Sequence, residues 1–182
     1  TNVNTTTTMP IICRDAEIIM RNNGNVSFGN GCIVHPKASI IAEDGCNLIF
    51  GEYNIIEEHV KINACPKSNS NNVLAPTTIY IGNYNHFKVG CILENTHVEN
   101  FNIIDMRSEA NDCMIESKVI ITPLVKLPKR SSIKSSSIVL ENKLIIYNNN
   151  FKEVEFKKYI LDLYQLLSQI LPQSHSLHSI SV

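Results

Sequence analysis

The chain has 182 residues, a formal net charge of −1 at pH 7, 7% aromatic residues and no tryptophan. A charge this close to zero argues against nucleic-acid binding, which needs a basic surface and stacking side chains. No run of about 20 apolar residues is present, which excludes a transmembrane helix. A domain of this length buries roughly 70% of its unfolded surface and needs neither disulfides nor metals to fold.

The first ten residues, TNVNTTTTMP, are polar and of low complexity, so we expect residues 1–10 to be disordered. They lack the basic and then apolar layout of a secretory signal. Zinc ribbons and redox motifs need closely spaced CxxC pairs, and none is present. The cysteines are therefore interpreted as structural free thiols: Cys13, Cys32, Cys46, Cys65, Cys91 and Cys113.

Between residues 11 and 150 the dominant pattern is a repeat of six residues, with a large apolar residue at position 1 and a small one at position 5. A helix needs apolar residues every three or four positions and an ordinary strand every two. A period of six instead predicts an all-β solenoid, a parallel β-helix in which three hexads, about 18 residues, make one triangular coil. Position 1 points into the tube, so the predicted core is Phe28, Val34, Ile40, Phe50, Ile56, Ile62, Ile81, Phe87 and Leu93.

Several stretches between these hexads depart from the repeat. Gly29, Gly51 and Gly82 follow position 1 and predict tight corners with positive φ. The period is lost at 64–78, 105–114 and 123–137, which we interpret as loop insertions in the β-helix, and a shorter insertion is predicted at 42–49. The stretch 123–137 carries a basic cluster, interpreted as a solvated loop with an anion site as the alternative: Lys126, Lys129, Arg130 and Lys134.

Residues 151–172 carry apolar residues at spacings of four and three, the pattern of an amphipathic helix. Pro172 is expected to end this helix, and residues 173–182 to form a flexible tail. The apolar stripe is predicted to dock on the flank of the β-helix or to cover its last coil; a helix that binds a partner is the alternative. The stripe consists of Phe156, Ile160, Leu163, Leu167 and Ile170.

The search for chemistry finds no catalytic residue. The zinc of hexapeptide-repeat carbonic anhydrases needs three convergent histidines, but these four occupy different hexad positions and no two are 18 residues apart: His35, His59, His86 and His97. No phosphate-binding glycine motif and no candidate general base stands out. We therefore predict a protein that is not an enzyme and has no cofactor or metal. The alternative is a trimeric hexapeptide-repeat enzyme, an acyltransferase or a γ-carbonic-anhydrase-like protein.

Residues 34–65, VHPKASIIAEDGCNLIFGEYNIIEEHVKINAC, resemble the dynactin subunit 6 family, most specifically in the HPKA-x-IIAE-x-G run and in GE-x-N-IIEE. The similarity continues through IGNYNHFKVGC (81–91), MIESKV (114–119) and VLENKLIIYNNN (139–150) to the Ile170-Leu171-Pro172 ending. Residues 105–113 and 123–138 depart from the family pattern.

This resemblance implies a left-handed parallel β-helix with a C-terminal α-helix. It also implies a non-catalytic cytoplasmic scaffold subunit in the pointed-end complex of dynactin, on the cytoskeleton. The implied partners are a dynactin subunit 5-like β-helical subunit, an actin-related protein, a larger pointed-end subunit and, indirectly, dynein. The implied role is microtubule-based transport with cargo or adaptor attachment. Neither nucleic-acid binding nor membrane insertion is expected.

Overall fold

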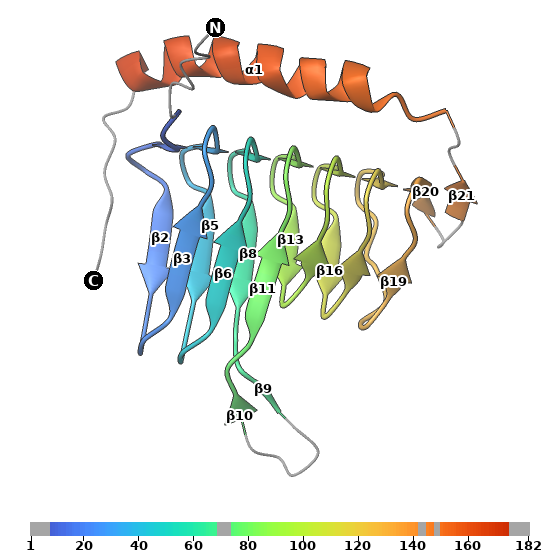
Figure 1. Ribbon diagram of the computed structural model, residues 1–182. Coiled ribbons are helices and arrows are strands. Elements are labelled where there is room, and N and C mark those ends of the chain that lie inside the picture. The colour runs from blue at the N-terminus through green and yellow to red at the C-terminus, as the bar shows by residue number, and fades with distance from the viewer. Residues whose placement is uncertain (1–7, 69–73, 142–144, 148–149, 175–182) are drawn as a thin grey trace, which may run out of the picture.

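A computed structural model describes residues 8–68, 74–141, 145–147 and 150–174. They form a three-faced parallel β-helix, with a hairpin projecting from one side and a long helix lying along another (Figure 1). Sheet A, the face beneath the helix, contains β1 (Ile11–Ile12), β4 (Ile33–Val34), β7 (Ile55–Ile56), β12 (His86–Phe87), β15 (Ile103–Ile104), β18 (Ile120–Ile121), β20 (Ser137–Val139) and β21 (Ile145–Tyr147).

The other two faces are also built from strands stacked one coil apart. Sheet B contains β2 (Glu17–Met20), β5 (Ser39–Ala42), β8 (Lys61–Ala64), β13 (Ile92–Glu94) and β16 (Glu109–Asn111). Sheet C contains β3 (Asn25–Phe28), β6 (Asn47–Phe50), β11 (Thr78–Ile81), β14 (His97–Val98), β17 (Met114–Ile115) and β19 (Ser132–Ile133).

The coils do not have the constant length of 18 residues that the hexads predict. Ile11, Ile33 and Ile55 are partners in successive strands of sheet A, so each of these coils has 22 residues. The next coil has 31, because it contains the hairpin, and later coils have 17 or 18. The early coils are longer because their strands in sheets B and C have four residues. The insertion predicted at 42–49 is this extra strand length and a tight turn.

Two predicted insertions are wrong, because 105–114 and 123–137 lie in regular coils. Strand β16 pairs with β13, and β19 pairs with β17. The first stretch hides the period because a small residue, Ala110, occupies the inward position. The second keeps a spacing of six with the strands that flank it, and these inward residues inside it and on either side are all at most 9% exposed: Ile121, Leu127, Ile133 and Val139.

The break predicted at 64–78 does leave the coil. Ala64 ends β8 and Thr78 begins β11, and between them β9 (Lys67–Ser68) and β10 (Leu74–Ala75) form an antiparallel pair. This hairpin projects away from the β-helix, on the side opposite α1 (Figure 1). Residues 69–73 lie outside the described residues.

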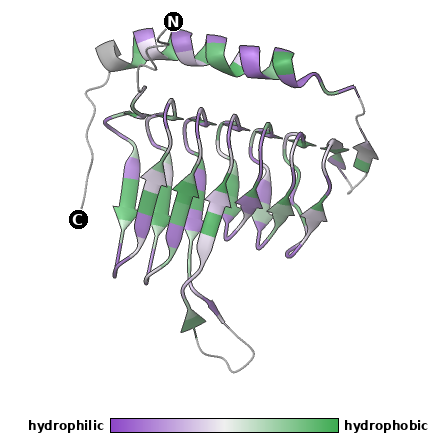
Figure 2. Ribbon diagram, viewed as in Figure 1, coloured by the Kyte–Doolittle hydropathy of each residue, from purple (hydrophilic) through white to green (hydrophobic). Residues whose placement is uncertain are grey.

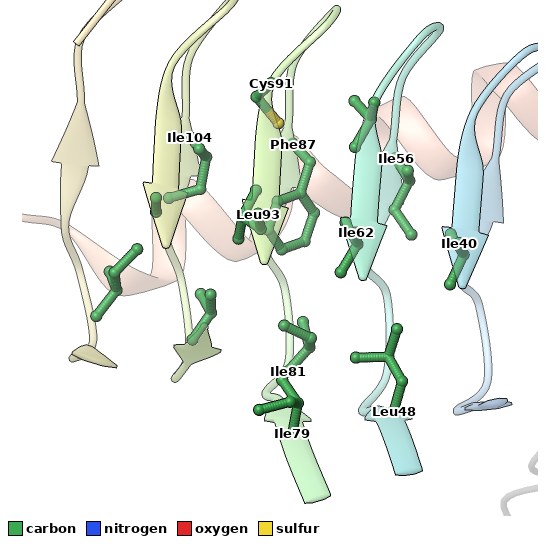
Figure 3. Close-up of a cluster of buried hydrophobic side chains, with 14 of the residues drawn as sticks. Ile40, Leu48, Ile56, Ile62, Ile79, Ile81, Phe87, Cys91, Leu93 and Ile104 are labelled. Atoms are coloured by element: carbon green, nitrogen blue, oxygen red, sulfur yellow. The ribbon is translucent and has the colours of Figure 1, made fainter. Parts of the chain in front are cut away.

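The core is a series of apolar layers stacked along the axis of the tube (Figure 3). Eight of the nine predicted core residues are at most 3% exposed. Phe28 is half-buried because it belongs to the first coil, where it stacks on Phe50 with ring centroids 4.8 Å apart and has a neighbouring layer on one side. In Figure 2 the strands are green over much of their length, with purple segments where polar residues occur.

The corner glycines correct the prediction of positive φ. Gly29, Gly51 and Gly82 do not have positive φ. A Cβ on Gly51 would lie 2.8 Å from the carbonyl oxygen of Gly82 in the next coil, so these glycines permit the close approach of stacked backbones. Positive φ falls two residues later, at Gly31, Tyr53 and their equivalents Tyr84 and Phe101.

A buried ladder of asparagines runs next to this corner. Asn54, Asn85 and Asn102 are all 0% exposed. The Asn85 side chain donates to Asn54 Oδ1 at 3.0 Å, and its own Oδ1 accepts the backbone N–H of Asn102 at 2.9 Å. Asn102 Oδ1 accepts the N–H of Val119 at 2.7 Å in the same way. Part of the chain's high asparagine content therefore serves to pair backbone groups at a corner where the strands have ended.

The two ends of the chain also differ from the prediction. Residues 8–10 are placed, because the Thr8 carbonyl accepts the N–H of Gly31 at 2.8 Å. The helix α1 (Glu153–Ser174) continues two residues beyond Pro172. A proline loses its own N–H hydrogen bond, but the residues after it can keep a helical backbone for a last turn. Residues 1–7 and 175–182 lie outside the described residues.

Candidate interaction surfaces

Strands β4, β7 and β12 of sheet A are buried on both sides. One residue of each short strand points into the tube, and its neighbour points outward and forms an outward row. The helix α1 lies along the outer side of this sheet (Figure 1). Ile33 and Ile55, both in that row, are 0% exposed. Adjacent apolar residues, as in Ile55-Ile56 and Ile103-Ile104, are typical of a strand with two buried faces. These doublets are the sequence signal that locates the face beneath the helix. The six-residue pattern alone does not reveal this signal.

The helix contacts sheet A through a stripe that differs in part from the predicted one. Phe156, Leu163 and Leu167 are half-buried and Ile160 is fully buried. Ile170 is 49% exposed, whereas Leu171 is 8% exposed and packs with Ile11, Cys13 and Ile33. Tyr164 also faces the β-helix, so the docked face of the helix is rotated by about one residue relative to the predicted stripe.

Tyr164 meets a ladder of stacked rings at the corner beneath α1. The Tyr53, Tyr84 and Phe101 rings are nearly parallel, with centroids 5.3 and 5.4 Å apart. Tyr164 packs its edge against Tyr53 at 5.5 Å, and Phe156 packs its edge against Phe101 at 6.5 Å. Such aromatic pairs each contribute about 0.5–1.5 kcal/mol beyond the burial of their surface. The ladder therefore selects the face of the helix that docks.

His86 is the polar exception in the outward row of sheet A. It is 2% exposed and lies between Glu57 Oε1, 2.6 Å from its Nε2, and Tyr159 Oη, 3.0 Å from its Nδ1. Burial raises the pKa of the Glu57 carboxyl, but the hydrogen bond and charge of His86 and the Val89 N–H outweigh it and lower that pKa. This chain of hydrogen bonds ties α1 to the β-helix.

Tyr159→Phe is expected to destabilise the docked helix by about 1 kcal/mol, because it removes the hydrogen bond to buried His86 and leaves the ring in place. The measurement is thermal unfolding followed by circular dichroism. Tyr80→Phe is the matched control, since Tyr80 is 56% exposed on sheet C. Equal melting temperatures for Tyr159→Phe and the wild type would show that this bond does not hold the helix.

The other predicted histidine and cysteine positions do not converge. His35 pairs with Glu58 at 3.0 Å, His59 lies at a corner with positive φ, and His97 stacks on Tyr80. In the part of the chain that the structure describes, no group of three or more His, Cys, Asp or Glu side chains is arranged to hold a metal ion. Glu57 and Glu58, which follow β7, contact different histidines.

Five of the six cysteines are buried, and Cys65 is half-buried. Burial raises the pKa of Cys13 and Cys32 to about 11 and also raises that of Cys91. Reactive cysteines need the opposite shift, because the thiolate is the nucleophile. Within the described residues, no helix is both long enough and apolar enough to span a membrane.

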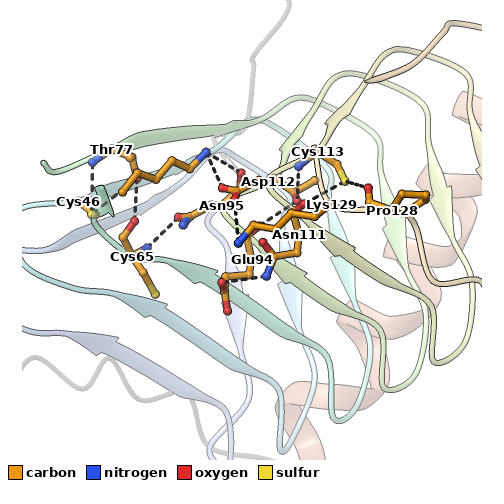
Figure 4. Close-up of polar contacts among 12 residues, drawn as sticks. Cys46, Cys65, Thr77, Glu94, Asn95, Asn111, Asp112, Cys113, Pro128 and Lys129 are labelled. Carbon is orange, nitrogen blue, oxygen red and sulfur yellow. Dashed lines mark hydrogen bonds and ion pairs between the residues drawn. The ribbon is translucent and has the colours of Figure 1, made fainter. Parts of the chain in front are cut away.

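A polar cleft of about 490 Å³ opens where the hairpin leaves the coil (Figure 4). Asp112 is at its centre, paired with Lys67 at 2.9 Å and with Lys129 at 3.3 Å. Burial raises the pKa of the Asp112 carboxyl, but the two lysines outweigh it and hold that pKa below its usual range. The Asn95 side chain accepts the N–H of Cys65 at 2.9 Å and so pairs the backbone at the point where the hairpin begins.

The predicted basic cluster is part of a coil and not of a loop. Lys126 pairs with Glu109 at 2.7 Å, and Lys134 pairs with Glu116 at 2.7 Å. Lys129 pairs with Asp112, as described above, while the Arg130 side chain is exposed. The three lysines are thus paired with carboxylates of the preceding coil.

The fold is shared with solved structures of low sequence identity. A hexapeptide transferase family protein from Anaplasma phagocytophilum superposes with a TM-score of 0.57 at 15% identity, over 89% of this chain and 93% of that one. A Bacillus cereus protein whose structure carries an acetyltransferase name gives a TM-score of 0.53 at 13% identity, over 88% of each chain. The chain is therefore a left-handed parallel β-helix of the hexapeptide-repeat class.

Curated relatives define its place within that class. Dynactin subunit 6 of Nematostella vectensis is 30% identical over 169 residues, which cover 91% of this chain and 86% of that protein. Dynactin subunit 6 of Danio rerio is 30% identical over 173 residues, covering 92% and 83%. No protein-family model matches the chain. The chain belongs to the dynactin subunit 6 family.

Proposed function

We propose that this chain is a non-catalytic scaffold subunit of a dynactin-like complex, in the cytoplasm on the cytoskeleton. Its place is the pointed-end complex, where it supports dynein-driven transport along microtubules and the attachment of cargo or adaptors. The observation that carries this proposal is the 30% identity to dynactin subunit 6 over nine-tenths of the chain. The proposed partners are a dynactin subunit 5-like β-helical subunit, an actin-related protein and a larger pointed-end subunit.

The geometry of the chain supports a structural role. Several of its buried polar groups are paired with one another, as in the hydrogen bond from Asn85 to Asn54 and in the Glu57–His86–Tyr159 chain, and these bonds connect the coils and the helix. A general base must instead reach the proton it abstracts from a substrate. The similarity to solved transferase structures is at 13–15% identity and shows a shared fold only.

Affinity purification of the tagged chain from its own cells, at low stringency, tests the proposal. We expect an actin-related protein and a second β-helical subunit to be recovered in near-stoichiometric amounts. A bacterial hexapeptide transferase with the same tag is the control. Recovery of the chain only with itself, as a trimer that binds zinc or coenzyme A, would contradict the scaffold role and favour the enzyme.

A further inference from the structure

The charges of the last β-helical coil, residues 122–140 (the terminal coil), differ from those of the coil before it. The terminal coil contains four basic residues and no acidic one. The preceding coil, residues 105–121, contains four acidic residues and two basic ones. Three of these carboxylates, those of Glu109, Asp112 and Glu116, pair with terminal-coil lysines 2.7–3.3 Å away. Acidic and basic side chains therefore meet at the same places on neighbouring coils.

The terminal coil also has open strand edges. In the preceding coil, the N–H groups of Glu109, Met114 and Glu116 donate to carbonyls of the terminal coil at 2.8–3.0 Å. The equivalent N–H groups of the terminal coil belong to Lys126, Ser132 and Lys134. Among the described strands, sheet C ends at β19, and sheet B ends at the bridge from Glu109 to Lys126. Sheet A, by contrast, is closed by the antiparallel strand β21.

An apolar hollow of about 220 Å³ opens at this end of the tube. Inward residues of the terminal coil line it together with Ile145 of β21, which is 40% exposed: Val125, Leu127, Ile133 and Val139. In the middle of the β-helix, the next layer of the core covers the equivalent residues. The hollow is thus the place where a further apolar layer would sit.

We propose that the terminal coil is the docking surface for an end coil of a β-helical partner that carries carboxylates opposite Lys126, Lys129 and Lys134. This inference rests on the proposed function and specifies which end is used and the partner's charge. Each lysine has three donors and can pair with a carboxylate on both sides. The partner's strand carbonyls accept the open N–H groups, and its apolar layer fills the hollow.

A second copy of this chain is a poor occupant of the same surface. Its first coil has 22 residues and four-residue strands in sheets B and C. The terminal coil follows an 18-residue step and has a two-residue strand in sheet C. The first coil also has mixed charges, because Arg14 and Arg21 occur there together with the acidic residues Asp15 and Glu17. The mismatch in size and charge favours a different chain as the partner.

The test uses the full chain and, as a defined probe, the purified dynactin subunit 5-like subunit of the same organism. Lys126→Glu with Lys134→Glu is expected to weaken binding at low salt at least about tenfold, because carboxylates would then face carboxylates. Lys37→Glu with Lys61→Glu changes the net charge equally on exposed sites elsewhere and should bind as the wild type does. If the double variant unfolds, the single variant Lys126→Glu, at a lysine side chain that is 70% exposed, replaces it.

A second pair of variants tests the hollow. Ile145→Asp should weaken binding, whereas Leu124→Asp, at a site 65% exposed, should not. Wild-type affinity in both the lysine variant (Lys126→Glu with Lys134→Glu) and Ile145→Asp would overturn the docking surface and leave the proposed function intact. Failure of the wild-type chain itself to bind the probe would contradict the proposed partner and, with it, this surface.

Discussion

Phe87→Asp is expected to abolish soluble, folded protein. Phe87 is 0% exposed in β12, between Ile56 and Ile104 of the neighbouring coils. Truncating a buried phenylalanine costs about 3–5 kcal/mol, and an unpaired buried charge adds to this. The sum approaches the whole stability of a domain, about 5–15 kcal/mol. Ile56→Asp in the preceding coil should behave in the same way. Soluble yield and far-ultraviolet circular dichroism measure the effect.

Ile92→Asp is the matched control for Phe87→Asp. Ile92 lies in the same coil but points outward and is 38% exposed, so its aspartate stays hydrated and the protein should remain folded. A soluble Phe87→Asp protein with the wild-type spectrum and melting temperature would show that the side chains at position 1 do not point into the tube.

Asn85→Asp is expected to destabilise the protein by about 3 kcal/mol or more at pH 7. Asn85 donates to Asn54 Oδ1, and a carboxylate in its place would repel that oxygen while buried at 0% exposure. Burial raises the pKa of such an aspartate in the folded protein. The loss should therefore be small below the pKa of the unfolded chain and grow as the pH rises through the folded value.

Chemical denaturation of Asn85→Asp at pH 4 and pH 7, each relative to the wild type, measures this difference. Asn100→Asp is the control, because Asn100 is half-buried and its Oδ1 accepts the N–H of Asn83, a role that a carboxylate retains. Equal destabilisation by Asn85→Asp at both pH values would contradict the conclusion that the buried Asn85 side chain donates a hydrogen bond to Asn54.

The sequence by itself determined the solenoid and the inward row. A hexad strand has a side chain pointing inward at position 1 whatever the neighbouring coils do, because that direction follows from the local alternation of the backbone. The helix after residue 150 is also a local prediction, because apolar residues at spacings of three and four fall on one face of a helix. The resemblance to the dynactin subunit 6 family also rests on sequence alone, since its relatives are matched residue by residue.

Only the tertiary structure decided the length of each coil, the course of 105–114 and 123–137, and the face of α1 that docks. Stacking lets a polar stretch such as 123–137 remain a strand-and-corner coil, because the neighbouring coil supplies backbone partners and carboxylates. The docking face depends on the aromatic ladder of Tyr53, Tyr84 and Phe101, which are 31 and 17 residues apart. These residues become neighbours only when the coils stack, so no local pattern shows them as one surface.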